Sequence, residues 1–153
     1  MYEDRIEKAT EYFKKGFNCS QSVVAAFADL YGIDEDTALK MSASFGGGIG
    51  RMRQTCGAAC GMFLLAGLET GSTDPTDRDG KAHNYAVVQE LAEKFKQENG
   101  SLICGELLGL APKAATPPTP EARTPEYYKK RPCSQMVRTA ATIFAQYLAD
   151  KEM

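Results

Sequence analysis

Apolar residues recur every three or four positions in several parts of the chain. Near the N-terminus, Ile6, Ala9 and Phe13 follow this spacing, and charged residues fill most of the positions between them. The same period returns near the C-terminus, where Val137, Ala140 and Phe144 belong to a longer apolar series. A period of 3.6 residues is typical of amphipathic helices, whereas half-buried strands alternate with a period of two. No segment shows strand alternation, so the pattern predicts an all-α fold.

Capping residues and glycines indicate where the first helices begin and end. The first helix is expected to end at Gly16. The second begins at Asn18, with Gln21 in the position of a capping box, and ends at Gly32. Asp34 is then expected to cap a short third helix.

A glycine-rich loop precedes the most apolar part of the chain. The sequence FGGGIG at residues 45–50 makes regular structure improbable. From about Thr55 an apolar run predicts a central buried helix. Its small residues Gly57, Ala58 and Gly61 leave room for another backbone to approach closely.

The second half alternates between helices and irregular segments. Residues 71–80 are rich in turn formers, and an amphipathic helix follows that ends near Gly100. Ser101 is expected to cap a short helix through Leu108. Residues 111–125 contain five prolines, which predicts an extended surface connection. The last helix is expected to start at Pro132. Together these elements predict a single-domain bundle of about six to seven helices over residues 1–153.

Composition narrows the function classes. A chain of 153 residues with 43% apolar residues is long enough for one hydrophobic core. Its 18 basic and 20 acidic residues are spread along the chain and give a net charge of -2, which argues against nucleic acid or a membrane surface as a partner. The N-terminal residues lack the pattern of a secretory signal, and no apolar run approaches the roughly 18 residues of a membrane span. We therefore expect a cytoplasmic protein.

The five cysteines are the main candidates for chemistry. Four of them fall in predicted first turns of helices, where unpaired backbone N–H groups and the helix dipole favour a thiolate and lower the thiol pKa. A thiolate is both a nucleophile and a metal ligand. The fifth cysteine lies four residues after another on one helical face, close enough to interact with it. The four are Cys19, Cys56, Cys104 and Cys133, and the fifth is Cys60.

The spacing of the cysteines leaves their chemistry open. In a reducing cytosol, thiols remain reduced, bind a metal or cycle through disulfides. Zinc ribbons and bacterial ferredoxin clusters place ligands a few residues apart, and none of the four first-turn cysteines is so close to another. A site for zinc or an iron–sulfur cluster therefore requires the fold to gather distant helix starts.

The contexts of the four cysteines resemble one known family. They occur, in order, in NCSQSV, in TCGAACG after the glycine-rich loop, in ICGELLG and in PCSQMV. This arrangement, from about Cys19 to Val137, resembles the C_GCAxxG_C_C family. The central motif here reads CGAACG, with glycine and cysteine exchanged relative to the family's name, and Cys60 is an additional cysteine. The resemblance implies that the other four cysteines are redox-active.

Two further features suggest weaker alternatives. The FGGGIG loop with Arg51 and Arg53 has the elements of an anion cradle, but it lacks the lysine of a phosphate-binding P-loop and follows no strand. We expect instead a tight loop that passes near Cys56. His83 is the only histidine, and a surface or capping role is expected for it. The sequence has no CxxC motif, which disfavours a thioredoxin-like mechanism.

The leading hypothesis is a thiol oxidoreductase in which Cys56 attacks an oxidised partner and Cys60 or Cys19 resolves the mixed disulfide. The partner is a redox protein or a small-molecule oxidant. One alternative is a metal site for zinc or an iron–sulfur cluster, and another is a helical interaction module with inert buried thiols. In the metal-site alternative the ligands are Cys19, Cys56, Cys104 and Cys133.

Overall fold

The computed structural model describes residues 1–111, 115–130 and 132–153. These residues form helices and connecting loops without a strand, and only one isolated β-bridge joins Thr55 to Ile103. The all-α prediction is confirmed, and six of the helices have eight residues or more. The helices are α1 Glu3–Lys14, α2 Cys19–Phe27, α3 Glu35–Ser42, α4 Gly57–Thr70, α5 Arg78–Asn99, α6 Cys104–Leu107, α7 Pro125–Lys130 and α8 Cys133–Lys151, with 3₁₀ turns at Ala28–Tyr31 and Ala43–Phe45.

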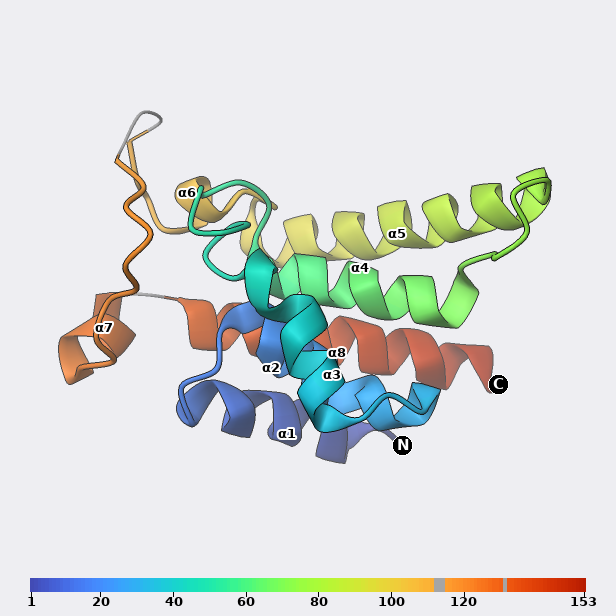
Figure 1. Cartoon of the computed structure of the whole chain (residues 1–153), viewed down its shortest axis with the longest axis horizontal. Coiled ribbons are helices and arrows are strands. Elements are labelled where there is room, and N and C mark those ends of the chain that lie inside the picture. The colour runs from blue at the N-terminus through green and yellow to red at the C-terminus, as the bar shows by residue number, and fades with distance from the viewer. Residues whose placement is uncertain (112–114, 131) are drawn as a thin grey trace.

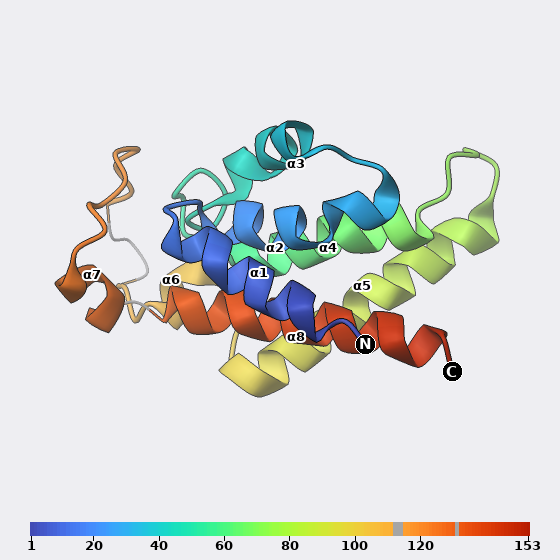
Figure 2. The ribbon, with the colours of Figure 1, turned by 90° about the horizontal axis from the view of Figure 1, so that it is seen from below.

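The direction of the helices places several N-termini together. Helices α2, α4 and α8 run the same way along the bundle and begin at the same end, on the left in Figure 1. Helices α1 and α5 run in the opposite sense, and α3 returns the chain from the end of α2 toward the start of α4 (Figures 1 and 2). The N- and C-termini lie at the other end (Figure 2). Local sequence signals therefore fix where each helix starts. The directions of the helices bring the starts of α2, α4 and α8 to the same end of the bundle.

The predicted caps at the first three helices are present. The Asn18 side chain accepts a hydrogen bond from the backbone N–H of Gln21 at 2.9 Å, and the Gln21 side chain accepts one from the Asn18 N–H at 3.1 Å. Asp34 accepts from the Thr37 N–H at 3.1 Å and caps α3. These bonds satisfy donors that a helix start leaves unpaired.

The core lies between α1, α2, α4, α5 and α8. Its large buried side chains include Phe27, Leu65, Phe95 and Phe144. Gly61 explains the close approach of α2 to α4, because a Cβ atom there would lie 3.0 Å from the Ser20 carbonyl oxygen and 3.1 Å from Val23 Cβ. The predicted use of a small residue at Gly61 is confirmed.

Three boundaries in the second half differ from the prediction. Helix α6 begins at Cys104, and the Ser101 hydroxyl accepts a hydrogen bond from the Ile103 N–H at 2.9 Å, before the helix rather than within it. Pro132 is the N-cap of α8, so the first helical residue is Cys133. The connection was predicted to be extended through residue 125, but α7 begins at Pro125, where proline needs no hydrogen-bond partner. Residues 112–114 of this connection lie outside the described residues.

Among the helices described, none combines the length and the apolar character that crossing a bilayer requires.

Candidate thiol site

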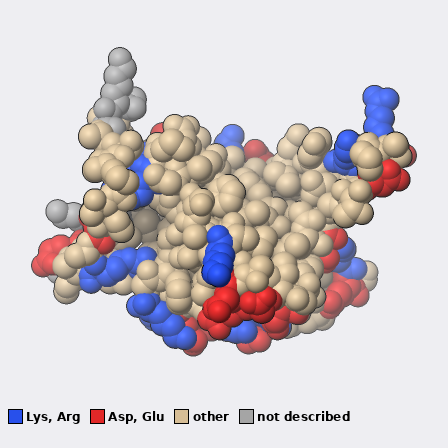
Figure 3. Space-filling view, in the orientation of Figure 1, with Lys and Arg blue, Asp and Glu red and all other residues tan. Residues whose placement is uncertain are grey.

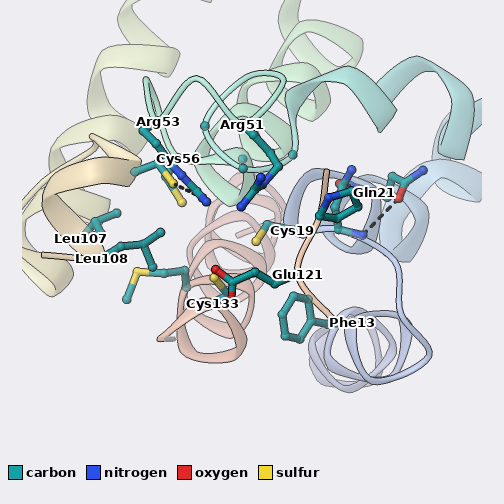
Figure 4. A pocket seen from close by; sticks show the side chains of 18 of the residues that line it. Phe13, Cys19, Gln21, Arg51, Arg53, Cys56, Leu107, Leu108, Glu121 and Cys133 are labelled. Atoms are coloured by element: carbon teal, nitrogen blue, oxygen red, sulfur yellow. Dashed lines mark hydrogen bonds between the residues drawn. The ribbon is translucent and has the colours of Figure 1, made fainter. Parts of the chain in front are cut away.

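The four first-turn cysteines meet at the end of the bundle where the helices begin. Cys19 is the first residue of α2, Cys104 of α6 and Cys133 of α8, and Cys56 is the N-cap of α4. In Figure 4 the side chains of Cys19, Cys56 and Cys133 point into one shared space. The sequence prediction that these cysteines occupy helix starts is confirmed. No disulfide joins any of the five cysteines in the structure.

A short stretch of backbone pairing places Cys56 beside Cys104. The Cys56 N–H donates to the Leu102 carbonyl, and the Cys104 N–H donates to the Gln54 carbonyl, both at 2.6 Å. This pairing surrounds the bridge between Thr55 and Ile103. It joins the starts of two helices that are distant in sequence.

A cavity of about 640 Å³ lies against the four cysteines. The glycine-rich loop forms one wall through Gly46, Gly47 and Gly48, and the proline-rich connection forms another through Pro118 and Pro120. Apolar side chains of the surrounding helices complete the lining, namely Phe13, Leu107, Leu108 and Met136.

The glycine-rich loop adopts left-handed backbone conformations that side chains rarely take. Residues 47–51 all have positive φ, including Ile49 at 65° and Arg51 at 60°, and Arg53 follows at 62°. Such non-glycine residues cost on the order of 1–3 kcal/mol each, and this strain is often found at functional sites. Gly48 makes room for Cys104, because a Cβ atom at Gly48 would lie 2.5 Å from Cys104 Cβ. The expectation that the loop passes near Cys56 is supported as well, because a Cβ atom at the next residue, Gly57, would lie 2.8 Å from the Phe45 carbonyl oxygen and 3.3 Å from Gly46 Cα.

Two arginines hold the proline-rich connection over the cavity. Arg51 donates hydrogen bonds to the carbonyls of Pro117 and Thr119. Arg123 donates to the Phe13 and Phe17 carbonyls at 2.9 and 2.8 Å, at the C-terminal end of α1, and its guanidinium lies 4.2 Å from the Phe13 ring centroid. The connection is therefore fastened both to the glycine-rich loop and to α1.

Charged side chains reach the cavity from both walls. The Arg53 guanidinium donates a hydrogen bond to Cys104 Sγ at 3.7 Å. Figure 4 shows the Glu121 carboxylate directed toward the region of Cys133. Glu121 and Arg123 did not figure among the sequence-predicted site residues. Their signal in the sequence is that they are the charged residues between Pro117 and Pro125.

Burial opposes the effect of the helix starts on the thiol pKa values. The pKa of Cys19 is raised well above its usual value, first because its thiol shares a hydrogen bond with Cys133 and then because it is buried. Burial raises the pKa of Cys56 to about 12, although hydrogen bonds from the backbone N–H groups of Ala59 and Ala58 act to lower it. The prediction of lowered pKa values is therefore wrong for Cys19 and Cys56, since burial was not visible in the sequence pattern.

Cys60 differs from the other four cysteines. It lies one turn into α4, its Sγ contacts the Thr55 carbonyl oxygen at 3.8 Å, and burial raises its pKa to about 11. It is not among the residues that line the cavity. His83 is exposed on α5, which agrees with its predicted surface role.

The metal-site alternative has weaker support. Within the part of the chain that the structure describes, no three His, Cys, Asp or Glu side chains are arranged to hold a metal ion. The four thiols share a cavity but do not form a ligand set in this geometry. On the face drawn in Figure 3, charges of both signs lie along the lower edge, and the area over α4 shows few.

The comparisons with known proteins agree with the cysteine pattern. Residues 17–147 match one protein family, described as "Putative redox-active protein (C_GCAxxG_C_C)". No curated protein and no solved structure was found to match. The match spans all the helix starts that carry the clustered cysteines and supports a general redox role. The chain belongs to the C_GCAxxG_C_C family.

Proposed function

We propose that this chain is a thiol–disulfide redox protein in which Cys19 and Cys133 form the reversible disulfide. The observation that carries the proposal is that these two side chains line one cavity at the adjoining starts of α2 and α8, where they share a hydrogen bond. A disulfide requires neighbouring cysteines whose sulfurs can reach about 2.05 Å. Sulfur atoms that already share a hydrogen bond meet the condition of proximity.

The surroundings support different roles for the two thiols. The hydrogen bond with Cys133 and burial both raise the pKa of Cys19 and so favour its protonated form, which can act as a donor toward Cys133. Cys133 is only partly buried and begins a helix of 19 residues, whose N-terminal end favours negative charge. These features favour Cys133 as the attacking thiolate and Cys19 as the resolving thiol. The earlier assignment of attack to Cys56 stays a prediction, which its pKa of about 12 disfavours.

The reaction is a two-step exchange with a disulfide-bearing oxidant. The Cys133 thiolate attacks one sulfur of the oxidant, whose S–S bond breaks and releases one thiolate. The Cys19 thiolate then attacks Cys133 Sγ, breaks the mixed disulfide and releases the second thiolate. The protons of Cys19 and Cys133 end on the two released thiols. The oxidant gains two electrons, and the protein loses two.

Redox titration with thiol mapping tests the proposal. Native protein is equilibrated in mixtures of reduced and oxidised dithiothreitol, alkylated and mapped by mass spectrometry. We expect a Cys19–Cys133 disulfide that forms and disappears reversibly. Cys133→Ser removes it, whereas Cys60→Ser, the control outside the cavity, leaves it unchanged.

Two results would contradict the proposal. One is reversible pairing of other cysteines in place of Cys19 and Cys133. The other is stoichiometric zinc or iron in anaerobically purified protein, with the clustered thiols protected from alkylation until a chelator is added, which would establish the metal alternative. Slow alkylation of all five cysteines without any oxidation would favour the inert helical module instead.

A further inference from the structure

The charge of the thiol cavity differs from that of the whole chain. The chain carries a net charge of -2. Among the described residues that line the cavity, the ionisable side chains other than the thiols and Tyr127 are three arginines and one glutamate, namely Arg51, Arg53, Arg123 and Glu121. An acidic protein thus encloses a cavity with an excess of positive charge.

Backbone partners do not cancel this charge. Arg51 and Arg123 donate hydrogen bonds to carbonyl oxygens of the proline-rich connection and of the end of α1, and Arg123 also donates to the uncharged Tyr128 hydroxyl. A carbonyl is a dipole without net charge, so each guanidinium keeps its full positive charge. These two arginines therefore fasten the walls and also raise the electrostatic potential inside the cavity.

Arg53 is the arginine best placed to meet a bound molecule beside the thiols. One of its N–H groups contacts Cys104 Sγ at 3.7 Å, which fixes the guanidinium next to the sulfur cluster. A guanidinium has five N–H donors in a planar fork that matches a carboxylate. The left-handed φ of 62° at Arg53 is a strained conformation, and it belongs to the strained loop that directs both Arg51 and Arg53 toward the cavity in Figure 4.

We propose that the cavity is a substrate site for low-molecular-mass disulfides that carry carboxylate groups, and that Arg53 binds a carboxylate while the disulfide lies against the thiols. This inference rests on the proposed function. The volume of about 640 Å³ is in the range of roughly 300–1,000 Å³ that small-molecule sites occupy. The excess of arginine selects anionic molecules, and the cysteines select those with an exchangeable S–S bond.

In this site the small disulfide is the oxidant. The Cys133 thiolate attacks one of its sulfurs, and the S–S bond breaks to release one half as a thiolate. Attack by Cys19 on Cys133 Sγ releases the second half. The two halves take up the two protons that the cysteines lose, so the products are two small carboxylate-bearing thiols and the Cys19–Cys133 disulfide.

Three small disulfides of different charge test the proposal on the reduced, full-length chain. Oxidised glutathione carries carboxylates, 2-hydroxyethyl disulfide is neutral and cystamine is cationic. The rate of Cys19–Cys133 disulfide formation is measured at low salt with each small disulfide. This rate is divided by the rate at which the same small disulfide oxidises the chain unfolded in urea. The ratio corrects for the different intrinsic reactivities of the three small disulfides. We expect oxidised glutathione to show the highest ratio and cystamine the lowest.

Charge-changing variants assign the preference to the cavity. Arg53→Gln is expected to lower the rate with oxidised glutathione roughly tenfold and to leave the neutral disulfide within about twofold. Arg53→Lys, which keeps the charge, restores part of the loss, and Glu121→Gln raises the rate with oxidised glutathione. Arg78→Gln, at the exposed start of α5, is the matched control and changes neither rate.

The outcomes separate this proposal from the redox function. The proposed substrate class is overturned if the three disulfides give equal rate ratios. It is also overturned if Arg53→Gln lowers the rates with the anionic and the neutral disulfide equally. Both outcomes leave the redox function intact. Failure of every disulfide, including oxidised dithiothreitol, to oxidise Cys19 and Cys133 overturns both.

Discussion

The middle of the bundle and the end that carries the cysteines are built from the same helices but packed differently. In the middle, Phe27 of α2 and Phe144 of α8 are fully buried and meet edge to face, with ring centroids 5.1 Å apart. At the end where these helices begin, the neighbouring residues are cysteine, glycine and arginine, and a cavity of about 640 Å³ remains.

Each helix therefore has a middle that stabilises the fold and a start that carries the reactive side chains. Large apolar side chains in the middle bury the area that stabilises the bundle. The helix starts carry smaller side chains, such as Cys19 and Cys56, and leave room beside them for the strained loop and for unfilled volume. A substitution in the middle should therefore change unfolding alone, whereas one at the end should change thiol reactivity as well.

The largest effect is expected in the middle. Phe144→Ala removes a fully buried ring and its contact with Phe27, which should lower the free energy of unfolding by about 3–5 kcal/mol. Urea unfolding followed by circular dichroism measures the loss. Tyr85→Ala, at a residue that is 62% exposed, is the control and should change stability by less than about 0.5 kcal/mol. Similar losses at both positions would refute the assignment of the core.

The glycine-rich loop offers a paired test at the cysteine end. Gly48→Ala places a Cβ atom 2.5 Å from Cys104 Cβ, whereas at Gly50 the nearest atom is 4.0 Å away, although both residues have positive φ. Both variants should lose about 1 kcal/mol from backbone strain. Gly48→Ala should lose roughly 1–3 kcal/mol more and change the alkylation rate of Cys104. Equal stability and equal alkylation in the two variants would show that the loop does not pack on Cys104.

Alkaline pH should weaken the end that holds Cys56. The folded state raises the pKa of this thiol from 9.0 to about 12, so the unfolded chain loses the proton first as pH rises. The contribution of the protonated, buried Cys56 thiol to the free energy of unfolding is complete below pH 9.0. It is lost between pH 9.0 and about 12, at about 1.4 kcal/mol per pH unit. Urea unfolding at several alkaline pH values gives the free energy of unfolding as a function of pH, and this free energy should fall less steeply with pH in Cys56→Ser than in the wild type. An unchanged slope would mean that Cys56 is not shielded from solvent.

A smaller effect on stability is expected where the proline-rich connection is fastened. Arg123→Ala removes the hydrogen bonds to the end of α1 and should lower stability by about 1 kcal/mol. Alkylation of Cys19 and Cys133 should become several-fold faster, and that of Cys60 should not change. Arg138→Ala, which breaks an exposed ion pair with Glu7, is the control and should not affect the thiols. Unchanged alkylation in Arg123→Ala would show that the connection does not cover the cavity.

Local sequence signals were sufficient for the helices and for the place of the cysteines in them. Asn18, Asp34 and Gly16 act within one turn of chain, so their effect is visible in the sequence. The family resemblance implied that Cys19, Cys56, Cys104 and Cys133 are the family's cysteines, but their meeting in one cavity was not predicted, because it depends on helix directions that no local signal encodes. The position of Cys133 as the first residue of α8 differed from the prediction by one residue.

The electrostatic part of the site could not be read from the sequence. A helix start lowers a thiol pKa through groups within its own first turn, whereas the burial that raises the pKa depends on what the rest of the chain places around that thiol. Arg123 reaches carbonyls of residues about 110 positions earlier in the chain, and such a contact has no signature in spacing. The left-handed conformations of Ile49, Arg51 and Arg53 were likewise hidden, because a glycine-rich stretch indicates only that unusual conformations are allowed.

The origin of the four cysteines in four separate helices has a consequence for biosynthesis. Cys19 is synthesised first, and its partner Cys133 follows only after both Cys56 and Cys104. Until then the nascent chain holds Cys19, Cys56 and Cys104 without the helix that completes the cluster. The dithiol would therefore come into being at the last stage of folding, and its appearance would report that the whole bundle has assembled.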